Sequence, residues 1–375
     1  MVFLVAAAFA QSAAPRKPAQ KAPAVQRKPL YKGIFEPVNY PKDINLLDVF
    51  FVTPDIGWVA GEHATILKTT DGGNHWVAEI GGDPGRGEPK IGQLRFLDEQ
   101  HGWAIQDGPK LLRTMDGQNW DEVKGEFPRG VPVLDYAFTS VDHGILLGGN
   151  GDAFYVTEDG GGHWTSVGPC RLNATVQGLA QTPSCHFIQL QMFSDRSGLA
   201  LAWWDAGANE QLVLFRTDDA GAHWSNVVPD VIDSRYVQMF FTDLNHGVLL
   251  FSDMKTCVTS DGGKTWRTLL SGKIDLASGA SVRFADPQVG WALGHSPHNR
   301  DAFRVSFTTD GGQHWQDSGD IAFPGSVLTD LHFAFPRRDR AYVIGPHGMI
   351  YRYRIVPAAY TAPHMLPGPL MPAAR

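Results

Sequence analysis

Six copies of one short motif constrain the fold of this chain more than any other feature of its sequence. The first copy reads TTDGGNHW, and we call the motif the octet. The copies occupy residues 69–76, 114–120, 157–164, 217–224, 259–266 and 308–315. Four of the five intervals between their closing tryptophans are 42 to 49 residues long. A period in the forties is typical of a propeller blade with four strands.

A second pattern precedes each octet. It is an apolar run, a polar turn and a second apolar run, as in LRFLDEQHGWAI, and it occurs seven times. Each unit therefore predicts strands A and B, a strand C that leads into the octet, and a strand D that begins at the octet tryptophan. The seventh copy begins at Leu331 and has no octet after it.

Seven A–B units predict an all-β fold, a seven-bladed β-propeller of four-stranded blades. The last blade lacks its own fourth strand, and an open sheet edge would invite aggregation. We expect YKGIFEPVNY (31–40) to supply that strand and to close the ring with the two ends of the chain. A six-bladed ring with an extra hairpin is the alternative.

The octet is interpreted as a turn. In its first copy, Asp71 can accept hydrogen bonds from the backbone N–H groups that follow, two glycines permit positive φ, and Trp76 can bury a large ring. Copies spread around a ring cannot line one pocket, so structural roles are expected for Asp71, Asp116, Asp159, Asp219, Asp261, Asp310, Trp76, Trp120, Trp164, Trp224, Trp266 and Trp315.

The octet resembles the Asp-box, or BNR repeat, Ser/Thr-x-Asp-x-Gly-x-x-Trp, which five copies match while the copy at 114–120 is one residue short. Combined with the F-x5-G-W-x-x-G pattern, it is most similar to the photosystem II stability and assembly-factor family, over about residues 33 to 356. The resemblance implies a seven-bladed propeller that binds protein and has no catalytic role of its own. The sequence itself does not indicate a photosynthetic host.

The two ends of the chain differ from the repeats. Residues 1–10 are interpreted as a truncated signal peptide, 11–32 as a basic Pro/Ala-rich linker, 33–356 as the propeller and 357–375 as a disordered Pro-rich tail. The alternative for residues 1–10 is an Ala-rich disordered tail, which would have a similar composition. Export to the periplasm or the extracellular space is expected.

Charge is divided unevenly between the first residues and the repeats. Residues 1–32 carry six basic side chains and no acidic one, whereas the whole chain has a formal net charge of −7. The acidic repeats argue against nucleic acid as a partner. The basic linker is either simply solvated or makes weak contact with an anionic membrane surface.

Three cysteines are present. Cys170 and Cys185 flank a long connection, and in an exported protein they can form a disulfide. Cys257 lies in an apolar run and is expected to be a small buried residue. No metal site and no cofactor are expected, because HSPH in the loop at 295–298 reads as a polar loop.

An enzyme is the contrasting hypothesis. A glycan-active hydrolase, sialidase-like or another glycosidase, needs two facing carboxylates. The B–C loops offer Glu62, Asp107, Asp152, Asp205, Glu210, Asp253 and Asp301. No Arg-Ile-Pro motif stands near the first blade, which makes a sialidase a poor match.

Insertions favour a binding role. Two B–C loops, at 203–211 and 294–303, and the connection between the two cysteines are longer than their counterparts. Propellers vary in such loops where they bind partners. We therefore expect a monomer without catalytic residues that binds a protein or peptide on one face, with candidate contacts Trp203, Trp204, Arg171, His298 and Arg300.

Overall fold

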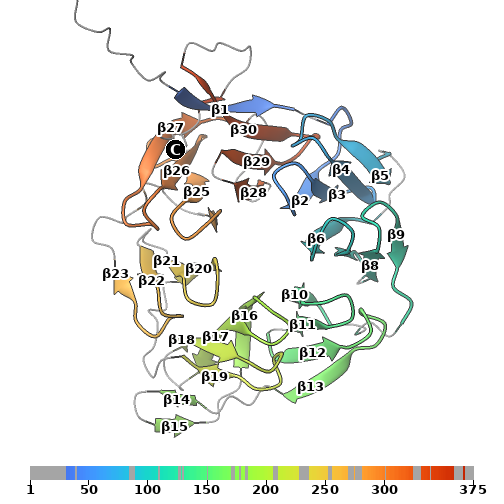
Figure 1. The fold of residues 1–375 in the computed structure, drawn as a ribbon, viewed down its shortest axis with the longest axis vertical. Coiled ribbons are helices and arrows are strands. Elements are labelled where there is room, and N and C mark those ends of the chain that lie inside the picture. The colour runs from blue at the N-terminus through green and yellow to red at the C-terminus, as the bar shows by residue number, and fades with distance from the viewer. Residues whose placement is uncertain are drawn as a thin grey trace, which may run out of the picture.

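The chain folds into a ring of radial β-sheets around a central channel (Figure 1). In the first six blades the first strand of the unit lies innermost and the fourth lies at the outer edge. The computed structural model describes residues 31–358 and 366–367, apart from 39, 84–88, 109, 126–127, 129–130, 150, 170–173, 177–178, 182–184, 206–209, 228–235, 252–255, 269–273, 275–280, 300, 324–330 and 338. The predicted all-β, seven-bladed propeller is confirmed. Among the described residues, no helix is long and apolar enough to span a membrane.

The first three blades follow the predicted order of four strands. Their strands are β2 (Leu46–Phe51), β3 (Gly57–Gly61), β4 (Thr65–Thr69) and β5 (Val77–Ile80); β6 (Ile91–Phe96), β7 (Gly102–Gln106), β8 (Lys110–Thr114) and β9 (Trp120–Glu122); and β10 (Val133–Phe138), β11 (Gly144–Gly148), β12 (Ala153–Thr157) and β13 (Thr165–Pro169).

Blades 4 to 6 repeat this order after a short two-stranded sheet. That sheet is β14 (Ala174–Val176) and β15 (Leu179–Gln181). The blades are β16 (Cys185–Met192), β17 (Gly198–Asp205), β18 (Glu210–Thr217) and β19 (Ser225–Asn226); β20 (Tyr236–Phe241), β21 (Gly247–Phe251), β22 (Thr256–Thr259) and β23 (Arg267–Thr268); and β24 (Ser281–Phe284), β25 (Gly290–His295), β26 (Phe303–Thr308) and β27 (Gln316–Ile321).

Blade 7 joins the two ends of the described chain. It contains β28 (His332–Arg337), β29 (Arg340–Ile344), β30 (Ile350–Pro357) and β1 (Tyr31–Pro37). Strand β1 pairs antiparallel with β30 from Tyr31↔Pro357 to Pro37↔Tyr351. Figure 1 shows the blue first strand beside the red last ones. The predicted closure by an N-terminal strand is confirmed.

A further strand lies outside that closure. Strand β31 (Leu366–Pro367) pairs with β1 at Phe35 and Ile34. These two residues fall within the segment that the sequence led us to expect as a disordered tail. Their pairing covers the free edge of β1, which would otherwise be the outer edge of blade 7.

The glycine that opens strand B is required by the phenylalanine that ends strand A. In blade 2 the two residues, Gly102 and Phe96, stand directly opposite each other. A Cβ atom on Gly102 would lie only 2.3 Å from the Phe96 ring. The same approach, at 2.4 to 2.8 Å, recurs at Gly57, Gly144, Gly247 and Gly290. The spacing between phenylalanine and glycine in the repeat is therefore a packing requirement.

Aromatic rings join neighbouring blades. Trp58 in β3 stacks on Phe96 of the next blade with ring centroids 3.8 Å apart, and Trp103 stacks on Phe138 at 3.9 Å. Tyr342 of blade 7 stacks on Phe51 of blade 1 at 4.0 Å, so the closing interface follows the same rule. The hydrophobic core is thus divided among the interfaces between blades.

Each octet forms the turn between strands C and D. In the first copy, the Asp71 carboxylate accepts hydrogen bonds from Asn74 N (2.9 Å) and His75 N (3.0 Å), while Gly73 N donates to Thr69 Oγ1 (2.8 Å). Burial alone would raise the pKa of Asp71, but hydrogen bonds led by those from His75 lower it to about 2. The shorter second copy is built differently, because Asp116 accepts from residues two and three positions later, at 2.9 and 2.7 Å.

The octet also docks its blade onto the preceding one. A Cβ atom on Gly73 would lie 2.7 Å from Tyr342 of blade 7, and one on Gly161 would lie 2.3 Å from Leu111 of blade 2. Arg352 of blade 7 donates to Gly72 O at 3.2 Å. The octet glycines therefore serve both the positive φ of the turn and the close approach of two sheets.

The seam between blades 1 and 2 contains a buried carboxyl group. Glu79, whose side chain is 8% exposed, accepts a hydrogen bond from Trp120 Nε1 (2.9 Å), and its other oxygen lies 3.9 Å from Lys68 Nζ. Lys68 itself donates to Gly117 O at 2.5 Å. Burial raises the pKa of Glu79 to about 7, although Trp120 and Lys68 oppose that rise. This carboxyl group therefore titrates near neutral pH.

Candidate functional site

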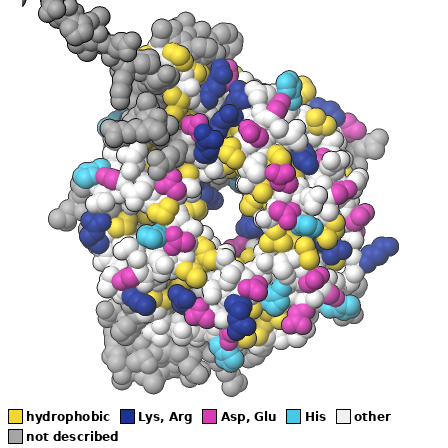
Figure 2. All heavy atoms as spheres, viewed as in Figure 1, with side chains coloured by type: hydrophobic (Ala, Val, Ile, Leu, Met, Phe, Trp, Pro, Cys, Tyr) yellow, Lys and Arg dark blue, Asp and Glu magenta, His cyan; other side chains and the backbone are white. Residues whose placement is uncertain are grey.

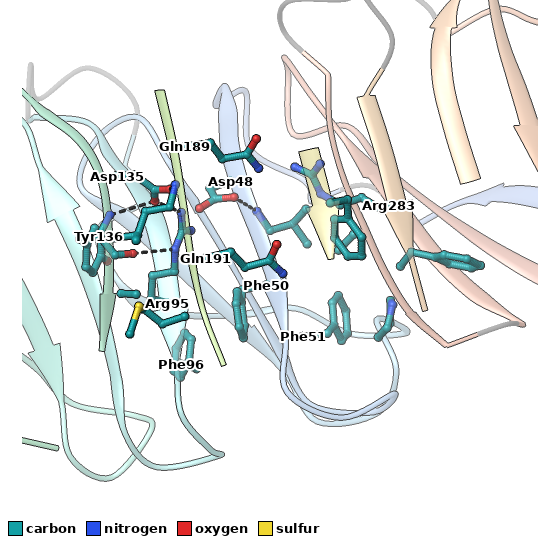
Figure 3. Close-up of a pocket in the computed structure, with 18 of the residues that line it drawn as sticks. Asp48, Phe50, Phe51, Arg95, Phe96, Asp135, Tyr136, Gln189, Gln191 and Arg283 are labelled. Atoms are coloured by element: carbon teal, nitrogen blue, oxygen red, sulfur yellow. Dashed lines mark hydrogen bonds and ion pairs between the residues drawn. The ribbon is translucent and has the colours of Figure 1, made fainter. Parts of the chain in front are cut away.

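The central channel encloses about 600 Å³ and is lined by the first strands of all seven blades. Figure 2 shows it open at the centre of the ring, with dark blue basic side chains at its edge. Figure 3 shows the side chains that line it: aromatic rings such as Phe50 and Phe96, with the polar groups of Asp48, Arg95 and Asp135 beside them. A volume of this size, with aromatic rings and polar side chains in its walls, has the dimensions of a ligand site.

Two glutamines on β16 bind the free inner edge of the next blade. Gln189 donates from Nε2 to Met239 O (2.6 Å) and accepts from Met239 N (3.1 Å). Gln191 makes the same pair of bonds with Phe241, at 2.5 and 3.0 Å. An innermost strand leaves backbone groups without a strand partner, and these side chains satisfy them.

Two aspartates perform the same task with their carboxylates. Asp48 Oδ2 accepts from Leu94 N of the next blade at 2.6 Å, and Asp48 Oδ1 accepts from Val49 N at 2.8 Å. Asp135 Oδ2 accepts from Leu190 N of the next blade at 3.4 Å. The negative charges of the channel are therefore engaged by the protein itself.

The channel contains two arginines with different surroundings. Arg95 pairs with Asp135 at 2.9 Å and donates from Nε to Tyr136 O at 3.3 Å. Burial opposes its charged form, but Asp135 and Asp48 hold the pKa of Arg95 above its usual value. Arg283, on the other side of the channel in Figure 3, makes one hydrogen bond with the residues that the structure describes, to the carbonyl oxygen of Val282 (2.9 Å).

Sequence reasoning missed these channel residues. The signal was present, because polar residues such as Asp48, Asp135 and Arg283 interrupt apolar A strands at alternate positions. Alternation along an innermost strand places such residues toward the channel and the next blade. The contacts expected from the sequence lie in the loops of one face instead, and they stay a prediction.

The five predicted contact residues are only partly placed by the structure. Trp203 is half-buried in β17 and packs against the core between blades 4 and 5. Trp204 lies in the same strand, in register with Cys185 and Gln211. His298 is exposed in the B–C loop of blade 6, where its N–H donates to Ser296 Oγ at 3.1 Å. Arg171 and Arg300 lie outside the described residues.

The connection between blades 3 and 4 is only partly described. Its hairpin, β14 and β15, lies at the outer edge of the ring beside β19 (Figure 1). That this connection extends the same face as the B–C loops stays a prediction. Cys170 lies outside the described residues, so the predicted disulfide with Cys185 stays a prediction. Cys257 is buried, as expected.

The acids considered for a hydrolase have varied surroundings. Glu62 pairs with Lys90 at 2.8 Å, and Asp107 accepts from the N–H of Lys90 at 3.4 Å. Both are thus engaged by one residue, Lys90, which directly precedes the first strand of blade 2. Within the described ranges, no group of three His, Cys, Asp or Glu side chains is arranged to hold a metal ion.

Comparison with known proteins identifies related chains. The family model described as photosynthesis system II assembly factor YCF48 matches residues 30–127. Photosystem II assembly protein Ycf48 of Thermosynechococcus vestitus is 25% identical over 352 residues, which cover 90% of this chain and 88% of the relative. Photosystem II assembly lipoprotein Ycf48 of Nostoc sp. is 25% identical over 84% of this chain and 86% of the relative.

Among solved structures, one described as YCF48 bound to D1 peptide covers 90% of this chain and 99% of its own, with a TM-score of 0.57 and 19% identity. At this identity the match concerns the fold alone. The matches in sequence and in fold agree with the resemblance that the octets indicated. The chain is thus a seven-bladed β-propeller with Asp-box-like octets, similar in sequence to photosystem II assembly proteins over most of its length.

Proposed function

We propose that this protein is an exported, non-catalytic β-propeller that binds a protein or peptide partner and acts as an assembly factor. The observation that carries the proposal is the similarity to Ycf48 proteins over 84% to 90% of the chain, since both relatives described above are named as assembly proteins. A solved Ycf48 structure is described as bound to a peptide, which supports a peptide segment as the class of partner.

The geometry of the repeats supports binding rather than turnover. The octet carboxylates are engaged within their turns, and the channel carboxylates bind backbone N–H groups of the next blade. A hydrolase instead needs two carboxyl groups that face a substrate. We therefore assign binding to the loop-rich face, which we define as the face that carries the B–C loops and the connections between blades.

The protein acts outside the cytoplasm, close to a membrane. The Nostoc relative is named a lipoprotein, which supports an exported, membrane-associated place of action. The basic residues before Lys32 suit weak contact with an anionic membrane surface. We propose the periplasm or the extracellular space as the location, and a monomer as the working form.

A matched pair of variants in blade 6 tests which face binds. His298 is exposed in the B–C loop and His314 is 69% exposed in the C–D turn, so the two histidines stand at opposite ends of strand β26. Immobilised protein is incubated with a membrane extract of the native host, and recovered proteins are quantified by mass spectrometry. We expect His298→Ala to reduce recovery of the partner and His314→Ala to leave it unchanged. Equal recovery by both variants, or loss with His314→Ala alone, would refute the assignment to this face.

A further inference from the structure

The strand register places seven side chains, one from each blade, at a single level of the channel. In six blades, this residue of strand A stands opposite the strand-B residue that directly follows the glycine. In blade 7 the corresponding pair is Ala334 and Tyr342. All seven line the channel. In blade order they are Phe50, Arg95, Ala137, Gln191, Phe240, Arg283 and Ala334.

Arg283 is the polar member of this ring with donors left over. Arg95 is paired with Asp135, and Gln191 uses its amide oxygen and nitrogen on Phe241. Arg283 donates one hydrogen bond, from Nη1 to its neighbour's carbonyl oxygen, and no described carboxylate lies within ion-pair distance of it. Its Nε and second Nη nitrogen therefore have no protein partner among the described residues.

The charges that face Arg283 do not neutralise it by direct contact. Burial lowers the pKa of Arg283, the charge of Asp48 opposes this effect, and the charge of Arg95 adds to it. The Asp48 oxygens accept from backbone N–H groups at 2.8 and 2.6 Å. The channel thus offers a ligand free hydrogen-bond donors, whereas its carboxylate oxygens are already engaged.

Space for the body of a ligand lies beside Arg283. The next blade places Ala334 at this level, where a small side chain leaves room, and the blade after it places Phe50. Phe240, on the other side of Arg283, packs on Phe284 with ring centroids 5.9 Å apart. An apolar or aromatic body can therefore lie between Ala334 and the phenylalanine rings while an anionic group meets the guanidinium.

We propose that the central channel is a binding site for a small carboxylate with an apolar or aromatic body, held by the guanidinium of Arg283 in the gap left by Ala334. This site is separate from the loop-rich face and does not depend on the partner proposed there. A carboxylate suits it because the fork of the guanidinium binds two oxygens at once, and the channel of about 600 Å³ has ample room for one aromatic ring.

Calorimetric titration of the full chain with benzoate and with benzamide tests the proposal without any variant. The two probes have the same shape and differ in charge. We expect saturable binding of benzoate, and at least about tenfold weaker binding of benzamide, because a hydrogen bond to a charged group contributes more than a neutral one. Equal affinity for the two probes, or no binding of benzoate, would overturn the proposal.

Two pairs of variants locate the site. Arg283→Gln should weaken benzoate binding at least about tenfold, whereas Arg216→Gln, which removes a half-buried arginine that pairs with Asp218 outside the channel, should not change it. Ala334→Leu should fill the gap and weaken binding, while Ala137→Leu, the same change at the same level in blade 3, should weaken it less. If Arg283→Gln binds benzoate as the wild type does, the proposal is wrong.

A carboxylate could also reach Arg283 on the side chain of a bound peptide. Titration with a blocked glutamate-containing peptide, with and without saturating benzoate, separates these sources. Benzoate binding that the peptide does not weaken supports the small-molecule site. The proposal would be overturned if the protein binds the peptide but not benzoate, and if Arg283→Gln abolishes the peptide binding.

Discussion

Replacing Glu79 by glutamine should change how the stability of the propeller depends on pH. The carboxyl group is buried in the seam between blades 1 and 2, and its pKa is raised from 4.5 to about 7. A raised pKa means that the folded state favours the protonated form. The stability contributed by Glu79 is thus present below pH 4.5 and is lost as pH rises through about 7.

The size of this stability change follows from the pKa shift of Glu79. Each pKa unit corresponds to about 1.4 kcal/mol, so this shift corresponds to about 3 kcal/mol at most, and partial solvent screening reduces it to about 2 kcal/mol. Glutamine resembles the neutral carboxyl group and can still accept the hydrogen bond from Trp120 Nε1. Glu79→Gln should therefore match the wild type near pH 5 and be more stable than it by about 2 kcal/mol at pH 8.

Urea denaturation at pH 5, 6, 7 and 8, followed by tryptophan fluorescence, measures this difference. Glu122→Gln is the control, because it removes an exposed carboxylate that pairs with Lys110 and should change stability by less than about 0.5 kcal/mol. A stability difference between Glu79→Gln and the wild type that stays constant from pH 5 to pH 8 would refute the reasoning.

Two further predictions concern the repeat. Gly102→Ala should destabilise the fold by about 1–3 kcal/mol and lower the midpoint of urea denaturation, because the added Cβ would lie 2.3 Å from the Phe96 ring. Gly92→Ala should be tolerated, because no atom lies within 4 Å of the position of its Cβ. Arg352→Met should destabilise the fold by about 1–3 kcal/mol, since it removes a buried arginine that pairs with the half-buried Glu36 and donates to Gly72 O of blade 1, while Arg354 still pairs with Glu36. The control Arg216→Met breaks an exposed ion pair and should cost less than about 1 kcal/mol. Limited proteolysis should then cleave Arg352→Met faster than this control, and equal cleavage would contradict the role assigned to the seam.

The fold was predictable because its residues repeat. The strand-A phenylalanine, the strand-B glycine and the octet each leave a mark on the sequence at every blade, and the unfilled fourth strand of blade 7 predicted its closure by residues near Phe35. The sequence did not predict that the octet glycines serve both the turn and the contact with the preceding blade. Contact with the preceding blade, such as that of Gly73 with Tyr342, depends on how two sheets pack.

The channel was not predicted from the sequence, for a physical reason. Single polar residues such as Asp48, Gln189 and Arg283 look like interruptions of a strand until the ring brings them together in the channel. Loop residues such as His298 attract attention because they depart from the repeat, but sequence does not show where a long loop points. Closing a ring converts seven separate alternating patterns into one surface, which no single strand displays.

The central claim is binding without turnover, and one measurement tests it directly. The partner recovered from the host membrane extract is purified and incubated with the protein at equal concentration, and the mixture is examined over a day by native and intact-mass spectrometry. We predict a stable one-to-one complex in which the mass of the partner stays unchanged, and a weaker complex with His298→Ala. A partner that is cleaved or loses a glycan, in the presence of the protein and not without it, would contradict the account.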